Sequence, residues 1–376
     1  MPAPLERRTL LKAGMGAATV AVVGTELAAA SAASAAPSPQ FPWIIDTGSW
    51  GAHPPTSEIV LRHGTTRKII VHHTAYPNST DYSRDQAIWL ARDIQRLHQQ
   101  VNGWADSGQH FTVSRGGYVL EGRARSLETL VSGTAQVQSA HCPGRNHDSI
   151  GIENEGTYIT ETPTQALWDS LVRLSVAICH QYGIQAHNVF GHWDFRATLC
   201  PGAAFYRQFP QLRREIAVEL GTPLSDVPER TWPDIYDAIG GPVVRLAQYL
   251  LRERGYAIAV TGAYSAAMTA AIQDWQARHG LVVSPDGTMT GPTWETMAPE
   301  LGHDATGEAV SGLQNMLGPK GYDEVTVTGV FDHATKKAVQ DLQLLHGLPV
   351  NGKVDASTWC VISGGVVRDS FRGTLR

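Results

Sequence analysis

Cysteine, net charge and long apolar runs are all scarce in this 376-residue sequence. Four cysteines are too few for a scaffold built on many disulfides, so each needs its own explanation. Lys and Arg number 30 against 35 Asp and Glu, and the formal net charge of -5 gives no basic surface excess for nucleic acid or an anionic membrane. Beyond the N-terminus, no stretch is long and apolar enough to cross a bilayer. We therefore expect no nucleic-acid partner and no membrane association of the mature chain.

Residues 1–36 are predicted to be a signal peptide rather than part of the fold. The pair Arg7-Arg8 precedes a mildly apolar stretch, and residues 28–37 are almost pure Ala and Ser, as expected around a small-residue cleavage site. The pattern resembles a twin-arginine export signal, although Glu6 stands where Ser or Thr is usual. An uncleaved anchor helix is the alternative, but several glycines interrupt the ~20 apolar residues that a span needs.

Residues 37–222 are predicted to form an α/β domain, because strand-like and helix-like segments alternate along them. Apolar, β-branched runs indicate strands at 68–72, 110–114, 149–153 and 189–192. Apolar residues at helical spacing indicate helices at 84–100 and 164–182, and Gly183 follows the second of them. The expected fold is a mixed central sheet flanked by helices.

The C-terminal part contains an internal repeat, with units predicted at 241–300 and 303–365 after a Pro- and Gly-rich linker at 223–240. For example, Val260-Thr261-Gly262 recurs as Val327-Thr328-Gly329. Each unit reads as helix, turn, helix, turn, helix, which predicts two small three-helix modules. The order of their motifs resembles that of the peptidoglycan-binding modules often fused to wall hydrolases.

Three residues are candidate metal ligands because of their positions on the expected strands. His72 ends one buried strand, and its neighbour His73 should point to the opposite face because side chains alternate. His192 ends another strand, and Cys200 follows after a loop short enough to return to the same metal. Catalytic zinc sites keep three such protein ligands and one open position. Spacing alone makes this a weak signal.

The order of the motifs is more specific. Val71-His72-His73-Thr74-Ala75 is followed by Ser149-Ile150-Gly151-Ile152-Glu153, and then by Gly191-His192 with Cys200-Pro201-Gly202. This order resembles the type-2 N-acetylmuramoyl-L-alanine amidases, a fold shared with the peptidoglycan recognition proteins and the phage lysozyme-type amidases. The resemblance covers roughly Trp43 to Gly221. It implies that His72, His192 and Cys200 bind Zn2+, and that the bond cleaved joins N-acetylmuramic acid to the L-alanine of the stem peptide.

The resemblance also implies catalytic residues. Glu153 lies where many bacterial members carry a glutamate and is the predicted acid/base, with Glu155 on the same strand face as the alternative. Gln109 replaces a catalytic Tyr of many members. It can donate a hydrogen bond to an oxyanion but cannot carry a proton. Thr198 replaces the Lys of some members, and its hydroxyl is expected to stabilise developing negative charge.

The remaining cysteines and histidines have simpler interpretations. His141-Cys142-Pro143-Gly144 superficially copies the metal-binding end of the domain, and a second zinc site with His147 is a disfavoured alternative. We predict instead that Cys142 pairs with Cys179 as a disulfide, and that Cys360 is buried and unpaired. His110 is predicted to be structural or substrate-facing. His279 and His346 are predicted to lie at helix ends, and Trp275 and Trp294 in the cores of the repeats.

Together these features predict a secreted or wall-associated monomer that hydrolyses peptidoglycan with zinc, held on the polymer by its repeats. Two alternatives stay open. One is a muropeptide-binding protein on the same fold that does not cut, and the other is a zinc peptidase that cuts within the stem peptide.

Overall fold

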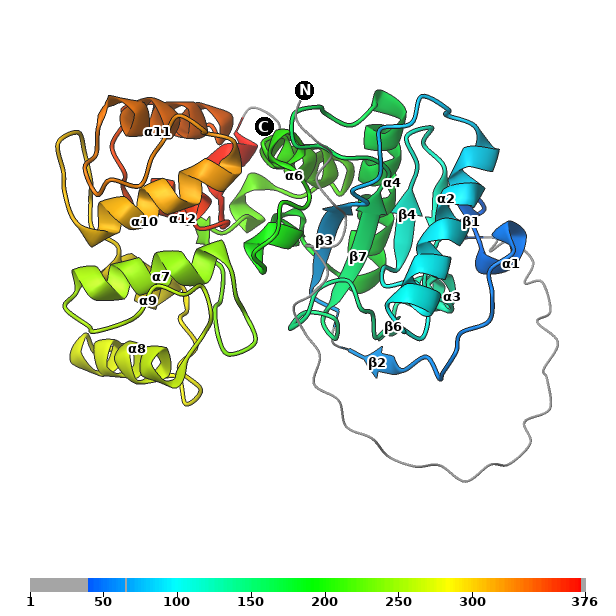
Figure 1. The fold of residues 1–376 in the computed structure, drawn as a ribbon, viewed down its shortest axis with the longest axis horizontal. Coiled ribbons are helices and arrows are strands. Elements are labelled where there is room, and N and C mark those ends of the chain that lie inside the picture. Colours follow the sequence, from blue (N-terminus) through cyan, green and yellow to red (C-terminus); the bar gives the residue numbers. More distant parts are fainter. Residues whose placement is uncertain (1–39, 65, 373–376) are drawn as a thin grey trace. The chain divides into compact units, whose positions relative to one another are not determined.

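The computed structural model describes residues 40–64 and 66–372. The predicted signal peptide, residues 1–36, therefore lies outside the described residues. Within them, an α/β domain is followed by two groups of three helices (Figure 1). Among the described helices, none is long and apolar enough to cross a lipid bilayer.

A six-stranded mixed sheet forms the centre of the α/β domain, with the strand order β1-β5-β4-β7-β3-β8. In that order the strands are Ile44–Ile45, Val119–Glu121, Phe111–Val113, Ser149–Asn154, Lys68–His73 and Val189–Gly191. Only β4 and β5 pair antiparallel within this sheet, and the other neighbours are parallel. The predicted mixed sheet and its four predicted strands are confirmed. Two short antiparallel pairs complete the strands: β2 (Leu61–His63) with β6 (Ala135–Val137), and β9 (Arg230–Thr231) with β10 (Val366–Val367).

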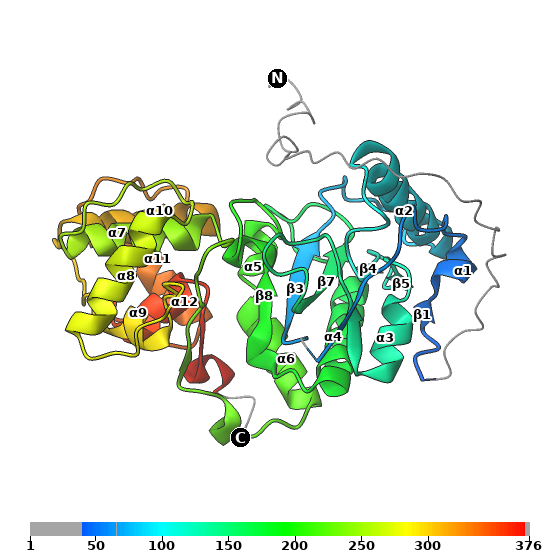
Figure 2. The same cartoon turned by 90° about the horizontal axis from the view of Figure 1, so that it is seen from below.

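Helices cover both faces of this sheet (Figure 2). On one face, α4 (Gln165–Tyr182) and α6 (Phe209–Glu219) pack with Ile69 and Val71 of β3 in one apolar cluster. On the other face, α1 (Thr47–Trp50) and α2 (Arg84–Arg96) pack with Leu120 of β5. The chain continues from α2 as a π-helical turn, Leu97–Val101, so the predicted helix at 84–100 changes its hydrogen-bond pattern near its end.

The remaining helices of the domain are short. They are α3 (Ser126–Ser132), α5 (Ala203–Tyr206) and the 3-10 turns Ala186–Asn188, His192–Asp194 and Leu224–Asp226. The turn that begins at His192 replaces the end of the strand predicted there. Residues of β3 are buried nearly throughout, as expected for a parallel strand covered on both sides.

Each repeat is a three-helix module, as predicted. The first contains α7 (Pro242–Glu253), α8 (Ala266–Arg278) and α9 (Gly291–Met297). The second contains α10 (Glu308–Leu317), α11 (His333–Leu345) and α12 (Ala356–Ile362), with 3-10 turns at Gly318–Lys320 and Arg368–Phe371. Trp275 and Trp294 are buried core residues, and His279 and His346 cap the C-termini of α8 and α11, so these predictions are confirmed.

The predicted disulfide between Cys142 and Cys179 is wrong, because all four cysteines are free. Cys142 packs in the same apolar cluster as Ile70 of β3, whereas Cys179 packs in the cluster of Ile69 and Val71. Successive residues of a strand point to opposite faces. The sheet therefore separates the two thiols. Cys360 is buried and unpaired, as predicted.

Candidate metal centre and acid/base

One row of paired residues crosses the sheet and carries the polar side chains of the site. Thr112 of β4 pairs with Glu153 of β7, and Glu153 pairs with His72 of β3. On the next strand, Gly191 of β8 pairs with Val71, so the following residue, His192, comes beside His72. The ring centroids of the two histidines are 4.4 Å apart. Sheet register alone thus gathers these side chains on one face.

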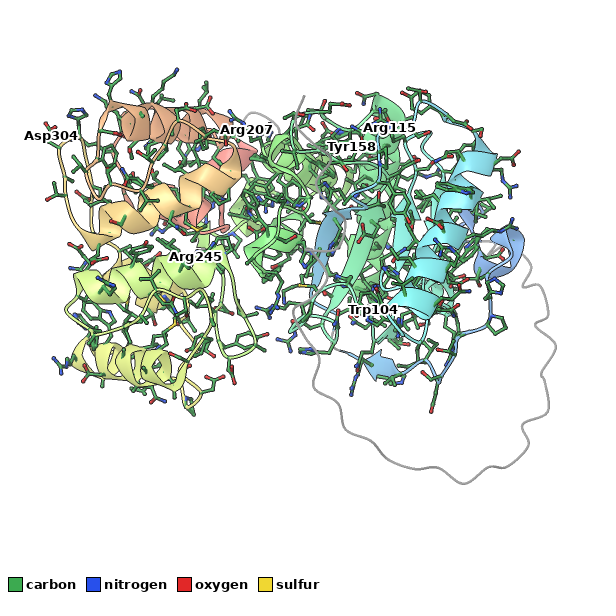
Figure 3. The ribbon with its side chains drawn as sticks, viewed as in Figure 1. Trp104, Arg115, Tyr158, Arg207, Arg245 and Asp304 are labelled. Atoms are coloured by element: carbon green, nitrogen blue, oxygen red, sulfur yellow. The ribbon has the colours of Figure 1, made fainter. Side chains whose placement is uncertain are left out.

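The row lies near the edge where the parallel strands end. The loops that follow β4 and β7 carry Arg115 and Tyr158, which Figure 3 shows close together at this edge. Ligands of open α/β sheets commonly bind outside the carboxyl ends of the strands. The position of the row is therefore typical of a functional site.

Cys200 returns to this edge and completes a group of three candidate ligands. One ligand atom from each of His72, His192 and Cys200 lies within 4.8 Å of the others. The Cys200 Sγ is 3.6 Å from His72 Nδ1, and the backbone N–H of His73 donates to this sulfur at 3.3 Å. Thr198 shapes the loop, because its Oγ1 accepts a hydrogen bond from the Cys200 N–H at 3.1 Å.

Burial keeps both imidazoles neutral. It is the main cause that lowers the pKa of His72 well below its usual value, with the neighbouring His192 and His141 adding to it. Burial, followed by the charge of Arg196, lowers the pKa of His192 to about 3. Metal ligation needs neutral imidazole, so both rings are in the required form at neutral pH.

Burial disfavours the thiolate form of Cys200 that a metal ligand needs. Burial, and then the nearby Glu153, raise the pKa of Cys200 well above its usual value. A thiolate in this environment therefore requires a cation beside it.

These residues fit a zinc ion. Two imidazoles and one thiolate form a donor set that zinc prefers, and three protein ligands leave the fourth tetrahedral position open, as in catalytic rather than structural zinc sites. The Nε2 of His192 is buried and has no hydrogen-bond partner within the described part of the chain. Buried polar atoms are rarely left unpaired, and a metal ligand is one explanation for such an atom. Across residues 40–64 and 66–372, His72, His192 and Cys200 are the single group with spacing suited to a metal.

Glu153 has one oxygen near the candidate ligands and one without a partner. Its Oε1 lies 3.9 Å from His72 Nδ1, its Oε2 is buried and accepts no hydrogen bond from the described residues, and the side chain is 18% exposed. Burial raises the pKa of this carboxyl to about 8. Such a carboxyl can hold or release a proton near neutral pH, as an acid/base catalyst must.

Glu155 follows directly after β7, and both of its carboxylate oxygens accept hydrogen bonds. One carboxylate oxygen accepts from Gln86 Nε2 at 2.8 Å and the other from the Arg115 backbone N–H at 2.7 Å. Its carboxylate therefore links α2 to the loop after β4. Between the two alternatives from the sequence, the free oxygen favours Glu153.

Gln109 is buried beside this row and donates from Nε2 to Thr112 Oγ1 at 2.9 Å, while its Oε1 has no partner among the described residues. His110 is structural. Its Nε2 donates to the Val137 carbonyl and its Nδ1 accepts from the Gly151 N–H. The ring of His73 accepts from the Tyr158 N–H rather than joining the three candidate ligands, as strand alternation predicted.

His141 and Cys142 belong to no group with spacing suited to a metal within the described residues. His141 instead contacts the candidate ligand His72, with 2.9 Å between its Nδ1 and His72 Nε2. The sequence did not predict this contact, nor that Thr112 would lie beside Glu153. One available signal was Gly151, because glycine inside a buried strand often marks a close approach.

The family model for N-acetylmuramoyl-L-alanine amidase matches residues 62–203, and the model for a peptidoglycan binding domain matches residues 240–297 and 306–362. Peptidoglycan-recognition protein SC2 of Drosophila melanogaster is 30% identical over 166 residues, which are 44% of this chain and 83% of that protein. The chain belongs to the N-acetylmuramoyl-L-alanine amidase family. Its α/β domain is hereafter the amidase domain.

Two further relatives show how far the similarity extends. Peptidoglycan-recognition protein LB of Drosophila melanogaster is 29% identical over 44% of this chain and 66% of its own length. A solved structure of that protein aligns with a TM-score of 0.39 over 44% of this chain and 91% of the solved chain. Human N-acetylmuramoyl-L-alanine amidase is 32% identical over 42% of this chain, but the match spans only 26% of the human protein. The similarity to these proteins thus covers less than half of this chain.

Proposed function

We propose that this protein is a zinc-dependent peptidoglycan amidase that hydrolyses the bond between N-acetylmuramic acid and L-alanine, in cell-wall turnover or lysis. The observation that carries the proposal is the row on the sheet. It brings two neutral imidazoles beside a carboxyl with a raised pKa and a free oxygen, and the buried Cys200 thiol returns to the same edge of the sheet. The family match adds the substrate class.

His72, His192 and Cys200 would hold the zinc ion. When bound, zinc supplies a Lewis acid that polarises the scissile carbonyl and lowers the pKa of a water molecule. Glu153 accepts the proton of the attacking water at Oε2, the oxygen that accepts no other hydrogen bond in the described chain. The same carboxyl then gives the proton to the nitrogen of the leaving L-alanine, which cannot depart as an anion.

Thr198 and Gln109 are proposed to stabilise negative charge on the carbonyl oxygen. The Oγ1 of Thr198 accepts from the Cys200 N–H, an arrangement that leaves its own hydroxyl hydrogen available to substrate. Gln109 uses one N–H on Thr112 and has a second to offer. Neither side chain releases a proton near neutral pH, so proton transfer rests on Glu153.

The rest of the chain is proposed to deliver the amidase domain to its polymer. The two repeats, predicted at 241–300 and 303–365 and separated from the amidase domain (37–222) by the linker 223–240, would bind peptidoglycan and raise the local substrate concentration. Residues 1–36 would direct export by the twin-arginine route, and the mature monomer would act outside the cell membrane.

The test is to digest peptidoglycan with the purified protein as isolated, after chelator treatment, and after zinc is restored. New termini are identified by mass spectrometry. We expect free L-alanine amino groups, intact glycan strands and restoration by zinc. New termini inside the stem peptide would make the protein a peptidase instead. Binding of muropeptides without release of any product by the zinc-loaded protein would make it a recognition protein.

A further inference from the structure

A chain of buried hydrogen bonds leads away from the candidate ligand His72. Its Nε2 lies 2.9 Å from His141 Nδ1. The Nε2 of His141 lies 3.3 Å from the hydroxyl of Ser149, and that hydroxyl donates to the backbone carbonyl of Arg145 at 2.6 Å. His72, His141 and Ser149 are all buried. The last acceptor in this series of hydrogen bonds, the Arg145 carbonyl, assigns the protons on the two rings.

The Arg145 carbonyl fixes the direction of every bond. A carbonyl oxygen can only accept, so Ser149 must donate to it and can only accept from His141. The proton of neutral His141 is therefore on Nε2, and its Nδ1 accepts from His72. His72 in turn carries its proton on Nε2.

The outcome for His72 is a free lone pair on Nδ1. This is the nitrogen that lies 3.6 Å from Cys200 Sγ and 3.9 Å from Glu153 Oε1, on the side of the candidate metal. If these hydrogen bonds ran in the opposite direction, the Ser149 hydroxyl oxygen and the Arg145 carbonyl would be two acceptors 2.6 Å apart without a proton between them. It would also place a proton on the nitrogen that must bind the metal.

Gly151 makes room for this arrangement. A Cβ at position 151 would lie 2.4 Å from Cγ and Cδ2 of His141, so the imidazole rests directly on the backbone of β7. Any side chain there would displace the ring. The ring plane of His141 stands at 87° to that of His72, which points one edge at His72 Nε2.

We propose that His141 is a positioning residue that sets the tautomer and orientation of the zinc ligand His72 through Ser149 and the Arg145 carbonyl. The inference rests on the proposed function, because it assumes that His72 binds zinc. Partners that bind the second nitrogen of a ligating histidine typically change metal affinity by about 10–100-fold when removed. In most zinc sites that partner is a carboxylate or a carbonyl, whereas here it is a second imidazole.

The experiment compares zinc affinity, measured by competition with a chromophoric chelator, in the full chain and three variants. His141→Leu removes the acceptor, and we expect zinc affinity to fall about 10–100-fold. His141→Asn keeps an acceptor oxygen close to the position of Nδ1, and we expect most of the affinity to return. His98→Asn is the control, because His98 accepts from the Gly108 N–H and lies outside the hydrogen bonds that link His72 to the Arg145 carbonyl, and we expect wild-type affinity from folded protein.

A second measurement needs no variant. Nitrogen-15 NMR of the metal-free wild-type protein reports which nitrogen of each histidine carries the proton, and we expect Nε2 for His72 and His141. A proton on His72 Nδ1, or wild-type zinc affinity in His141→Leu, overturns the inference.

The same measurements separate this inference from the proposed function. A wild-type protein that binds zinc but releases no L-alanine overturns the amidase proposal and leaves the inference standing. A wild-type protein that binds no zinc overturns both.

Discussion

The amidase site and the two repeats both bury polar side chains, but they satisfy them differently. In the site, His192 Nε2 and Glu153 Oε2 are buried and have no hydrogen-bond partner in the described chain. In the repeats, the buried glutamine Gln314 of α10 is bonded throughout. Its oxygen accepts from the N–H groups of Thr328 and Gly329, and its amide nitrogen donates to the Val330 carbonyl. Buried polar atoms in the two regions thus differ in their hydrogen bonding.

A buried glutamine in each repeat explains why the Thr-Gly motif recurs. Gln248 of α7 holds Thr261, Gly262 and Ala263 in the same way. The Thr-Gly pair recurs because a buried carboxamide binds its backbone, and the glycines adopt φ values of +74° and +72° that other residues rarely adopt. The recurring sequence is therefore scaffold.

The difference teaches how to separate stability from function among buried polar groups. An unsatisfied buried group costs about 1–3 kcal/mol, so a fold retains one where another molecule or ion completes it. Substitutions in the site should therefore cost activity, and substitutions in the repeats should cost stability. Two pairs of substitutions and two single substitutions test this, starting from the largest expected effect.

Cys200→Ser against Cys360→Ser compares two buried thiols, one from each region. Without the thiolate ligand, we expect zinc to be lost and kcat/KM for a soluble muropeptide to fall at least about a thousandfold, which corresponds to about 4 kcal/mol of transition-state stabilisation. Cys360 donates only to backbone carbonyls, so its variant should keep zinc and activity. Full zinc content and activity in Cys200→Ser would refute the ligand assignment.

Glu153→Gln against Glu155→Gln compares two neighbouring carboxyls, one near the end of β7 and one just after it. Loss of the acid/base should lower kcat by about 10²–10⁴ with zinc retained. The free energy of unfolding should stay level or rise, because the lost group has an unsatisfied buried oxygen. Glu155→Gln breaks satisfied bonds to Gln86 and Arg115 and should cost about 1–3 kcal/mol of stability with little change in kcat. The reverse pattern in kinetics and denaturation would assign the acid/base to Glu155.

Gln314→Leu tests the repeats alone. It leaves the N–H groups of Thr328 and Gly329 without their acceptor, so we expect the free energy of unfolding to fall by about 2–4 kcal/mol in urea titration. Turnover of a soluble muropeptide by the folded fraction should be unchanged. A selective loss of kcat at wild-type stability would show that the comparison fails for the repeats.

His98 gives the smallest effect and extends the comparison to a satisfied histidine within the amidase domain. Its Nδ1 accepts from the Gly108 N–H, and burial, followed by the charge of Arg123, lowers its pKa to about 4. A depressed folded pKa gives stability that is present above pH 6.5 and lost as pH falls toward 4. His98→Asn keeps the acceptor, so it should remove about 1–2 kcal/mol of the acid-induced loss between pH 6.5 and 4, with activity at pH 7 unchanged. An identical pH profile of unfolding in both proteins would contradict this.

Much of the fold and the candidate ligand set could be predicted from local pattern. The apolar runs at 68–72 and 149–153 read as buried strands because parallel strands covered on both faces are apolar throughout, and a histidine at the end of such a run must lie at the sheet edge. The repeats were visible because their motifs recur in order. These features depend on neighbours in sequence.

The rest depended on which loops fold over which face. His141 looked like a decoy because its partner His72 is distant in sequence, and the predicted disulfide failed because the sheet lies between Cys142 and Cys179. Glu153 and Glu155 share one face in any strand, so alternation could not separate them. Only the loop that brings the Arg115 N–H to Glu155 does so.

The sequence by itself determined the strands, the three-helix repeats and the position of two histidines at the ends of strands. It also determined a donor set suited to zinc. Only the tertiary structure decided which carboxyl keeps a free oxygen and that Cys142 and Cys179 lie on opposite faces of the sheet. It also decided which nitrogen of His72 carries the proton. The physical reason is range. Periodicity and strand alternation act between near neighbours, whereas a proton position here is set by the Arg145 carbonyl, which reaches His72 only through residues that the fold brings together.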